Sequence, residues 1–325
     1  MSRFFVFRDG CKSRRKKMEI ALQFVLLALG FVMLGKGADW FVEGAAGIAM
    51  RFGIPQLVIG LTIVAMGTSA PEAAVSIAAA VKGNADITIG NIVGSNILNI
   101  LVILGLAASI VPIAVARSTV RIEIPFMIGV TALLFYQGRD GSISLADGGV
   151  LMVAFAVYMM YLYTMAMKSN VDSELEEPGL PLGRCLLGAV GGLALIIAGS
   201  NVTVGAATSI ATYAGLSERF IGLTIVALGT SLPELFTSVA AARRGNADIA
   251  IGNIVGSNIF NILFVVGLSA LIIDIPFASA FNFDTYVALG AAVLLWLCVL
   301  RTKRLQRWAG ALMLVCYAAY LGYIL

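Results

Sequence analysis

Residues 59–106 read IGLTIVAMGTSAPEAAVSIAAAVKGNADITIGNIVGSNILNILVILGL, and residues 221–268 read IGLTIVALGTSLPELFTSVAAARRGNADIAIGNIVGSNIFNILFVVGL. The two stretches align without a gap at an offset of 162 residues, and about three-quarters of the positions are identical. The shared residues include Gly, Pro, Asn, Ser, Thr, Asp and Glu as well as aliphatic ones, so a common apolar composition does not explain the match. The chain therefore contains an internal repeat.

Composition places this repeat in a membrane. Of the 325 residues, 60% are hydrophobic and 12% are charged, and the mean hydropathy is +0.96. Soluble domains carry about 25% charged residues, so a soluble fold is excluded. Apolar runs of about 20 residues, each long enough to cross the hydrocarbon core of a bilayer as a helix, recur along the chain. The predicted spans lie near 19–48, 54–80, 86–111, 120–137, 146–167, 182–212, 218–242, 248–273, 283–300 and 306–325.

We therefore predict an all-α integral membrane protein with about ten transmembrane helices in two five-helix repeats. A basic N-terminal tail at 1–17 precedes the first repeat at 18–167, and a cytoplasmic linker at 168–181 leads to the second repeat at 182–325. An odd number of spans in each half forces the second copy to cross the membrane in the opposite direction. Inverted repeats with a binding site at their interface near the bilayer midplane are typical of secondary transporters.

Loop charges predict the orientation of the bundle. The loops after the odd-numbered spans carry Arg51, Arg117, Arg121, Lys168, Arg184, Arg243, Arg244, Arg301, Lys303, Arg304 and Arg307, whereas the opposite loops carry Lys82, Arg139 and Arg219. By the positive-inside rule the first set is cytoplasmic, which places the protein in the inner membrane of the cell with both termini outside the cytoplasm. The basic residues of the tail favour the opposite orientation.

Several kinds of chemistry are excluded by what the chain lacks. There is no histidine, so the commonest transition-metal ligand is missing. The four cysteines, Cys11, Cys185, Cys298 and Cys316, have no CxxC spacing, and neither a zinc site nor a disulfide framework is indicated. No phosphate loop or nucleophile motif is present. We expect no enzyme activity, no cofactor, no nucleic-acid partner and no obligatory protein partner beyond the lipid bilayer.

Each repeat carries the motif GTSxPE inside a span. The copies comprise Gly67, Thr68, Ser69, Pro71 and Glu72, and Gly229, Thr230, Ser231, Pro233 and Glu234. A carboxylate at the bilayer centre costs about 2.5 to 3.5 kcal/mol on insertion scales, so each glutamate indicates a function or a strong pairing. Proline opens the helix and frees carbonyls, and the two hydroxyls lie on or beside the face of the helix that carries the glutamate. These are the hard oxygen ligands that Ca²⁺ and Na⁺ prefer. The alternative interpretation is a proline kink whose Ser and Thr bond back to the helix.

The following span of each half carries GNIVGSN and a further Asn, at residues 90–99 and 252–261. Gly90 with Gly94, and Gly252 with Gly256, predict close approach of neighbouring helices. A serine and an asparagine four residues apart place a hydroxyl and an amide oxygen on one stripe, either as ion ligands or as interhelical hydrogen-bonding groups. These pairs are Ser95 with Asn99 and Ser257 with Asn261; the weaker candidates are Asn91, Asn96, Asn253 and Asn258.

Four other acidic residues receive different interpretations. Asp86 and Asp248 stand where helices begin, which favours a role as N-caps over a role as ligands. Asp39 and Glu43 lie in the first span and have no acidic counterpart in the second half. We expect these two to pair with Lys36 or to face a water-filled vestibule.

The paired motifs resemble the alpha repeats of the cation/calcium exchanger superfamily, and specifically the prokaryotic sodium/calcium exchangers, or calcium/sodium antiporters. The resemblance covers most of the chain. It implies exchange of Na⁺ for Ca²⁺ by alternating access, with the ions bound between Glu72 and Glu234 and with the long first and sixth spans as sliding gates. The ligand set that it implies is Thr68, Ser69, Glu72, Ser95, Asn99, Thr230, Ser231, Glu234, Ser257 and Asn261, with carbonyls near Ala65 and Ala227. Some relatives have Asp at the position of Asn261, so this chain has two central carboxylates rather than three.

Other functions stay open at this point. In a proton/calcium antiporter, Glu72 or Glu234 would carry a proton instead of sharing Na⁺, and a K⁺-dependent antiporter is a variant of the same scheme. The hydroxyls beside each glutamate favour sodium, because a proton needs no such cage. A cation channel lined by the glutamates is a third possibility, and it would conduct Ca²⁺ without a counter-ion gradient.

Overall fold

The computed structural model describes residues 2–83, 85–169, 180–215 and 227–324, and most of them are helical. The elements of the first half are α1 (Ser2–Arg51), α2 (Gln56–Ile59), η1 (Gly60–Val64), α3 (Ala65–Thr68), α4 (Ala70–Val81), α5 (Asp86–Leu98), η2 (Asn99–Leu104), α6 (Gly105–Ile110), β1 (Ile113–Ala114), η3 (Thr119–Glu123), α7 (Ile124–Gln137), η4 (Gly138–Asp140), β2 (Ser142–Ile143) and α8 (Leu145–Ser169). The elements of the second half are α9 (Leu182–Tyr213), α11 (Ala227–Thr230), α12 (Leu232–Arg243), α13 (Ala247–Phe260), η6 (Asn261–Val266), α14 (Gly267–Ile272), β3 (Ile275–Pro276), α15 (Ala280–Leu300), β4 (Arg304–Leu305) and α16 (Arg307–Ile324).

The predicted all-α membrane fold is confirmed. Within the described residues, eight helices are long and apolar enough to cross a membrane. A ninth span is the pair Gln56–Thr68 and Ala70–Val81, which bends by 51° at a short break. The remaining predicted span, the seventh at 218–242, begins outside the described residues and continues as α11 and α12. Most of the predicted linker at 168–181 also lies outside them.

Two short sheets show that the halves are inverted. Strand β1 pairs with β4, and β2 pairs with β3, both antiparallel. The repeat offset relates β1 to β3 and β2 to β4, so it exchanges one sheet with the other. Strands β1 and β4 follow the third and ninth spans and share one side of the membrane, whereas β2 and β3 follow the fourth and eighth spans and share the other. Equivalent loops therefore lie on opposite sides, as an inverted repeat requires.

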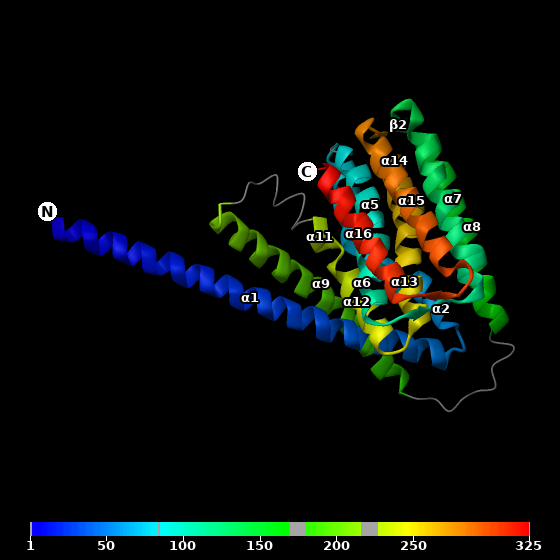
Figure 1. The fold of residues 1–325 in the computed structure, drawn as a ribbon, viewed down its shortest axis with the longest axis horizontal. Coiled ribbons are helices and arrows are strands. Elements are labelled where there is room, and N and C mark those ends of the chain that lie inside the picture. The colour runs from blue at the N-terminus through cyan, green and yellow to red at the C-terminus, as the bar shows by residue number, and fades with distance from the viewer. Residues whose placement is uncertain (1, 84, 170–179, 216–226, 325) are drawn as a thin grey trace.

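The two helices that carry the GNIVGSN motifs form the centre of the bundle. Every residue of α13 from Ile249 to Phe260 is buried, and most of α5 is buried as well. Helices α1, α8 and α16 lie on the outside and expose large apolar side chains, which suits contact with lipid. Figure 1 shows α1 and α9 side by side along one edge of the bundle, at an angle to the other helices.

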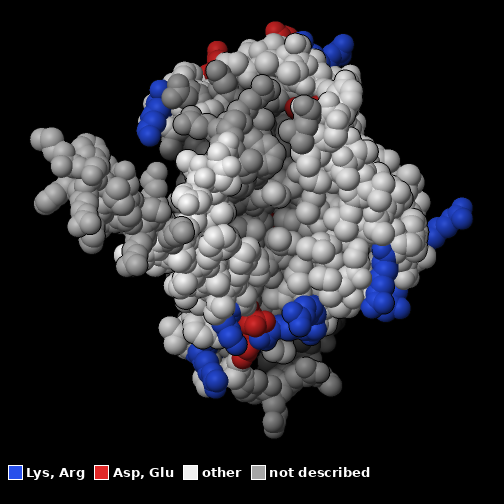
Figure 2. Space-filling model, turned by 60° about the vertical axis from the view of Figure 1, so that its left-hand side comes forward, with Lys and Arg blue, Asp and Glu red and all other residues white. Residues whose placement is uncertain are grey.

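The surface has the charge distribution of a membrane protein. Figure 2 shows acidic and basic side chains next to each other near the lower end of the visible face, with a broad uncharged surface above them. Buried positions include polar side chains as well, among them Glu72, Glu234 and Asn261. Burying a polar group costs free energy unless it has a hydrogen-bond partner. These residues therefore point to a functional region of the interior.

Candidate functional site

Each GTSxPE segment folds as a broken helix. Helix α3 ends at Thr68 and α4 begins at Ala70, and Ser69 between them has backbone angles φ −80° and ψ 5°. Pro71 has no N–H to donate to the carbonyl four residues earlier, which explains the break. Ser231 stands between α11 and α12 in the same way, with φ −89° and ψ 4°. The opening of the helix that each proline predicts is confirmed.

The two motif glutamates lie in one buried region. Glu72 and Glu234 are each 1% exposed. Ser69 Oγ donates to Glu234 Oε1 at 2.8 Å, and Ser231 Oγ donates to Glu72 Oε1 at 3.3 Å. Each serine therefore bonds the glutamate of the other half, so the two helix breaks meet at the pseudo-twofold axis of the repeat.

Helix α13 borders the site beside α3. The buried Thr68 has its Oγ1 3.0 Å from Asn253 Oδ1 and 3.0 Å from the carbonyl oxygen of Val64. Ser257 Oγ donates to the carbonyl oxygen of Ala65 at 3.3 Å. Three residues that the sequence predicts as ligands, Thr68, Ala65 and Ser257, thus lie together at the interface of α3 and α13.

Their counterparts lie at the equivalent place in the other half. Ala227 is the first residue of α11, and the partly buried Thr230 is its last. Ser95 is buried in α5, one helical turn before Asn99. Helix α11 packs against α5, as α3 packs against α13.

The predicted ligand asparagines begin two wider helical turns. Asn99 is the first residue of the π-helical segment η2, and Asn261 is the first residue of the π-helical segment η6. Such turns occur often at functional sites. Segment η2 packs against α12, which carries Glu234, and η6 packs against α4, which carries Glu72. Each predicted asparagine therefore lies in a segment that packs on the glutamate helix of the other half.

Four asparagines form a reciprocal amide network between α5 with η2 and α13 with η6. Asn96 Nδ2 donates to the carbonyl oxygen of Asn258, and Asn258 Nδ2 donates to the carbonyl oxygen of Asn96, both at 3.2 Å. Asn99 Nδ2 then donates to Asn258 Oδ1 at 2.9 Å, and Asn261 Nδ2 donates to Asn96 Oδ1 at 3.1 Å. A backbone carbonyl only accepts, so the first two bonds set the orientation of every amide in the network.

Among the side chains predicted as ligands, four buried acceptor oxygens have no hydrogen-bond partner. They are Glu72 Oε2, Glu234 Oε2, Asn99 Oδ1 and Asn261 Oδ1. Each half contributes one carboxylate and one amide oxygen, and these are groups that only a donor or a cation can satisfy. The described residues contain no cluster of three or more His, Cys, Asp or Glu that would hold a metal ion by itself. Around the two carboxylates, the other oxygens come from amide, hydroxyl and carbonyl groups.

Two further asparagines tie the broken helices to the central ones. Asn91 Nδ2 lies 2.9 Å from Ser76 Oγ and 3.3 Å from the carbonyl oxygen of Glu72. In the second half, Asn253 Nδ2 lies 2.9 Å from Ser238 Oγ and 3.4 Å from the carbonyl oxygen of Glu234. The weaker ligand candidates Asn91, Asn96, Asn253 and Asn258 therefore hold the framework of the site.

The N-cap prediction for two aspartates is wrong. Helix α5 begins at Asp86 itself, so its N-cap position is Ala85. Helix α13 begins at Ala247, its N-cap position is Asn246, and Asp248 lies inside the first turn. Each helix starts one or two residues earlier than a capping aspartate would require, so Ala85 and Asn246 occupy the N-cap positions.

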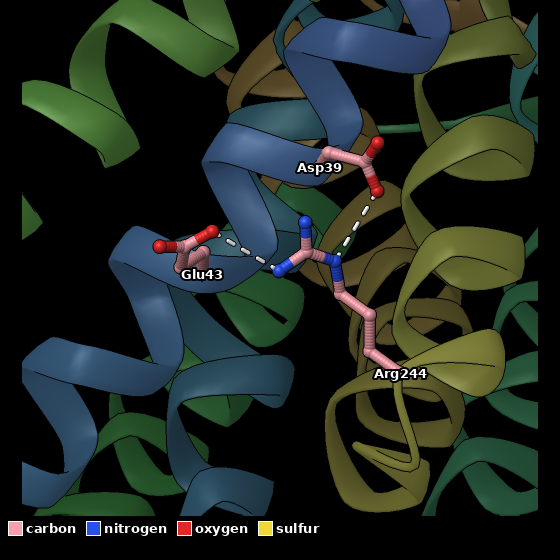
Figure 3. Close-up of polar contacts among 3 residues, drawn as sticks. All are labelled: Asp39, Glu43 and Arg244. Carbon is pink, nitrogen blue, oxygen red and sulfur yellow. Dashed lines mark hydrogen bonds and ion pairs between the residues drawn. The ribbon is translucent and has the colours of Figure 1, made fainter.

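The acidic residues of the first span have a partner that the sequence does not reveal. Asp39 and Glu43 do not pair with Lys36; Arg244, at the end of α12, lies 3.2 Å from Asp39 Oδ1 and 3.2 Å from Glu43 Oε2 (Figure 3). The three side chains are between 36% and 46% exposed, so the pairing also leaves them open to their surroundings. Residues separated by about 200 positions in the sequence cannot be matched by spacing alone.

A third buried carboxylate was missed by the sequence analysis. Glu123 is fully buried in η3, and Tyr161 donates its hydroxyl to Glu123 Oε1. Its equivalent in the second half is Thr285, so the repeat gives no indication of it. The sequence feature that could have revealed it is its position inside a predicted span, because acidic residues are unusual in membrane helices.

A family comparison agrees with the motifs. The sequence profile of the family described as sodium/calcium exchanger protein matches residues 22–164 and 185–325. The chain belongs to the sodium/calcium exchanger family. Within this family it is 32% identical to the sodium/calcium exchanger MaX1 of Methanosarcina acetivorans, over 93% of this chain and 98% of that protein. It is 41% identical to the inner membrane protein YrbG of Escherichia coli K12, over 76% of this chain and 79% of that protein.

Solved exchanger structures have the same fold. A structure of the sodium-calcium exchanger NCX_Mj soaked without Na⁺ and Ca²⁺ has a TM-score of 0.83 and 32% sequence identity, covering 94% of this chain and all of that chain. The same exchanger soaked with 100 mM Na⁺ and 10 mM Sr²⁺ also has a TM-score of 0.83, with 34% identity. The protein is therefore a multi-span membrane antiporter of cations, with Ca²⁺ among them, and it belongs to a family of transporters rather than of enzymes.

Proposed function

We propose that the protein exchanges Na⁺ for Ca²⁺ across the cell membrane by alternating access, with the ions bound between Glu72 and Glu234. The observation that carries this proposal is the crossed hydrogen bonding of Ser69 to Glu234 and of Ser231 to Glu72. It brings one carboxylate from each inverted half into a shared interior where each keeps an unpartnered oxygen. Hard cations bind to such oxygens.

The charge of this site explains how two fluxes would be coupled. Two carboxylates neutralise one Ca²⁺ or two Na⁺, so the ions compete for the same groups. The doubly negative site without ions is costly to bury, and the helices therefore rearrange only when cations are bound. An exchange of more than two Na⁺ for one Ca²⁺ moves net charge and responds to voltage by about 2.3 kcal/mol per charge per 100 mV.

The proposed ligands combine four kinds of oxygen. Carboxylates come from Glu72 and Glu234, hydroxyls from the Thr and Ser residues, amide oxygens from the two asparagines of η2 and η6, and carbonyls from the start of α3 and α11. The full set is Thr68, Ser69, Glu72, Ser95, Asn99, Thr230, Ser231, Glu234, Ser257 and Asn261, with the carbonyls of Ala65 and Ala227. All twelve lie on the broken helices and the two central helices. Ca²⁺ takes six to eight oxygens, so a subset of these groups is enough.

Helices α1 and α9 are the proposed moving gates. They pack mainly on each other along one edge of the bundle (Figure 1). Near the site, Ser200 Oγ of α9 donates to the carbonyl oxygen of Gly229 at 2.7 Å. That carbonyl is four residues before Pro233, so α9 provides the donor that the proline lacks. A shift of α9 would therefore change this hydrogen bond at the helix break beside Glu234.

Orientation and location follow from the loop charges. We place the loops that carry β1 and β4 in the cytoplasm, because the basic residues gather on that side. Both termini are then outside the cytoplasm. The relative YrbG is named an inner membrane protein, which supports the same location for this chain.

The coupling ion is tested by Ca²⁺ uptake into proteoliposomes under three conditions: an outward Na⁺ gradient, a pH gradient, and no gradient. We expect uptake against the Ca²⁺ gradient only with Na⁺. Equal uptake under the pH gradient alone would assign the protein to proton/calcium exchange. Downhill Ca²⁺ flux with neither counter-ion would indicate a channel.

A further inference from the structure

Helices α1 and α9 contact each other through their backbones. A Cβ atom added to Gly37 would lie 2.9 Å from the carbonyl oxygen of Gly192, and one added to Gly192 would lie 2.7 Å from the carbonyl oxygen of Gly37. Gly30 and Gly199 meet in the same way, at the symmetry-related place. Small residues at such a seam allow tight packing of membrane helices. We call these two helices the α1–α9 pair, and their packing indicates that they move as one body.

Two ion pairs join this pair to the rest of the bundle. Arg244 Nε lies 3.2 Å from Asp39 Oδ1, and Arg244 Nη1 lies 3.2 Å from Glu43 Oε2. Figure 3 shows the guanidinium at the end of α12 reaching between the two carboxylates, which stand one turn apart on α1. A cavity of about 490 Å³ lined by Trp40 and Glu43 opens beside them. The charges are thus in reach of water and salt.

Among the residues that the structure describes, the opposite mouth of the transporter shows no such arrangement. The repeat relates Arg244 to Lys82, Asp39 to Asn201 and Glu43 to Gly205. Lys82 is exposed, and the positions on α9 that would face it carry no acid. The other charged residue that lines the cavity on the side of Arg244 is Arg184 of α9. Closure of this side therefore has an electrostatic contribution that the described residues of the other side do not provide.

We propose that Arg244 with Asp39 and Glu43 is a clasp that holds the α1–α9 pair against α12 and biases the exchanger towards the state closed on this side. The inference rests on the alternating access of the proposed function. With the orientation given above, the clasped side is cytoplasmic, and the favoured state opens outward. The clasp makes the inward-open and outward-open states of this nearly symmetric molecule differ in free energy.

The bias sets the apparent affinity at each face. Apparent affinity falls in proportion to the fraction of molecules open on the side from which the ion arrives. Two partly exposed ion pairs shift such an equilibrium by roughly threefold to tenfold, and salt screens part of the shift. Loss of the clasp should therefore improve apparent Ca²⁺ affinity from the clasped side and weaken it from the other side.

The test compares the apparent KM for Ca²⁺ in right-side-out and inside-out vesicles that contain wild type, Arg244→Gln, Arg244→Lys or Lys82→Gln. We expect Arg244→Gln to change the ratio of the two KM values by roughly threefold to tenfold. Arg244→Lys should restore most of the wild-type ratio, and Lys82→Gln should leave it unchanged. An unchanged ratio in Arg244→Gln, or an equal change in Lys82→Gln, would overturn the clasp.

A second readout does not depend on transport. The chain has three tryptophans, and replacing Trp296 and Trp308 with Phe leaves Trp40, next to Asp39, as the reporter. We expect acrylamide quenching of Trp40 to increase when choline chloride screens the clasp, and to be high without salt in Arg244→Gln. Insensitivity of Trp40 to salt and to Arg244→Gln would contradict the clasp. A Trp40 response without Na⁺-driven uptake would instead retain the clasp and remove the proposed function.

Discussion

Ser69 donates its hydroxyl to Glu234 at 2.8 Å, across the interface between two halves that lie 162 residues apart in the sequence. The reciprocal bond from Ser231 to Glu72 is longer, at 3.3 Å. These bonds orient one oxygen of each carboxylate and leave the other without a partner. Because the bond from Ser69 is the shorter one, we expect its loss to have the larger effect on ion binding.

Ser69→Ala should weaken ion binding more than Ser231→Ala. A hydrogen bond to a charged group contributes about 1.5 to 3 kcal/mol, so the loss at Ser69 should raise the apparent KM for Ca²⁺ by about tenfold or more. The measurement is the Ca²⁺ dependence of Na⁺-driven uptake. Ser109→Ala is the matched control, because its Oγ bonds only the carbonyl oxygen of Gly105 in its own helix. Equal effects of all three substitutions would contradict this role for Ser69.

The amide network should control ligand orientation at a distance. Asn258→Ala removes the acceptor that holds Asn99 Nδ2, so the Asn99 amide is free to turn its oxygen away from the site. We expect about a tenfold loss of apparent Ca²⁺ affinity, corresponding to one hydrogen bond of about 1.4 kcal/mol. Asn282→Ala, at the start of α15, is the control. Unchanged affinity in Asn258→Ala would show that Asn99 needs no such support.

Close packing of α13 on the first broken helix should be sensitive to one methyl group. A Cβ on Gly256 would lie 2.7 Å from the carbonyl oxygen of Leu61 and 2.8 Å from the Cβ of Ala65, whereas a Cβ on Gly35 meets no atom within 4 Å. Gly256→Ala should destabilise the protein by about 1 to 3 kcal/mol through overpacking, and Gly35→Ala should be neutral or stabilising. Thermal unfolding in detergent measures both. Equal midpoints in the two variants would be inconsistent with the packing.

The third buried carboxylate should matter for stability rather than for exchange. Glu123→Gln keeps an oxygen that accepts from Tyr161, so its unfolding midpoint and its uptake should resemble those of wild type. Glu123→Ala leaves the tyrosine hydroxyl without that acceptor and should cost about 1 to 3 kcal/mol in the free energy of unfolding. Loss of Na⁺-driven uptake in a stably folded Glu123→Gln would assign Glu123 to the transport path.

The repeat made much of this architecture predictable. Identical residues at matching positions indicated the inverted halves, and Pro71 and Pro233 indicated the helix breaks. Glu72 and Glu234 could be proposed as neighbours because an inverted repeat places equivalent positions around one axis. The repeat and the two prolines were enough to predict these features.

Other features depend on contacts that spacing does not encode. The partner of Asp39 is Arg244, far away in the sequence, and Glu123 has no counterpart in the second half. The division of the asparagines into proposed ligands and supports rests on which amides donate to a backbone carbonyl, as those of Asn96 and Asn258 do. Helix α13 begins before Asp248, so a residue type favoured at N-caps was not sufficient to locate the cap.

The most direct test of the shared site is equilibrium binding of radioactive Ca²⁺ to the purified protein, with and without Na⁺. We expect wild type to bind Ca²⁺ in competition with Na⁺, and Glu72→Gln and Glu234→Gln each to lose at least about a hundredfold in affinity, because removing one buried charge partner costs about 3 to 5 kcal/mol. Glu123→Gln, which removes an equally buried carboxylate elsewhere, should bind as wild type does. Retention of wild-type Ca²⁺ affinity in either Glu72→Gln or Glu234→Gln would contradict binding between the two glutamates.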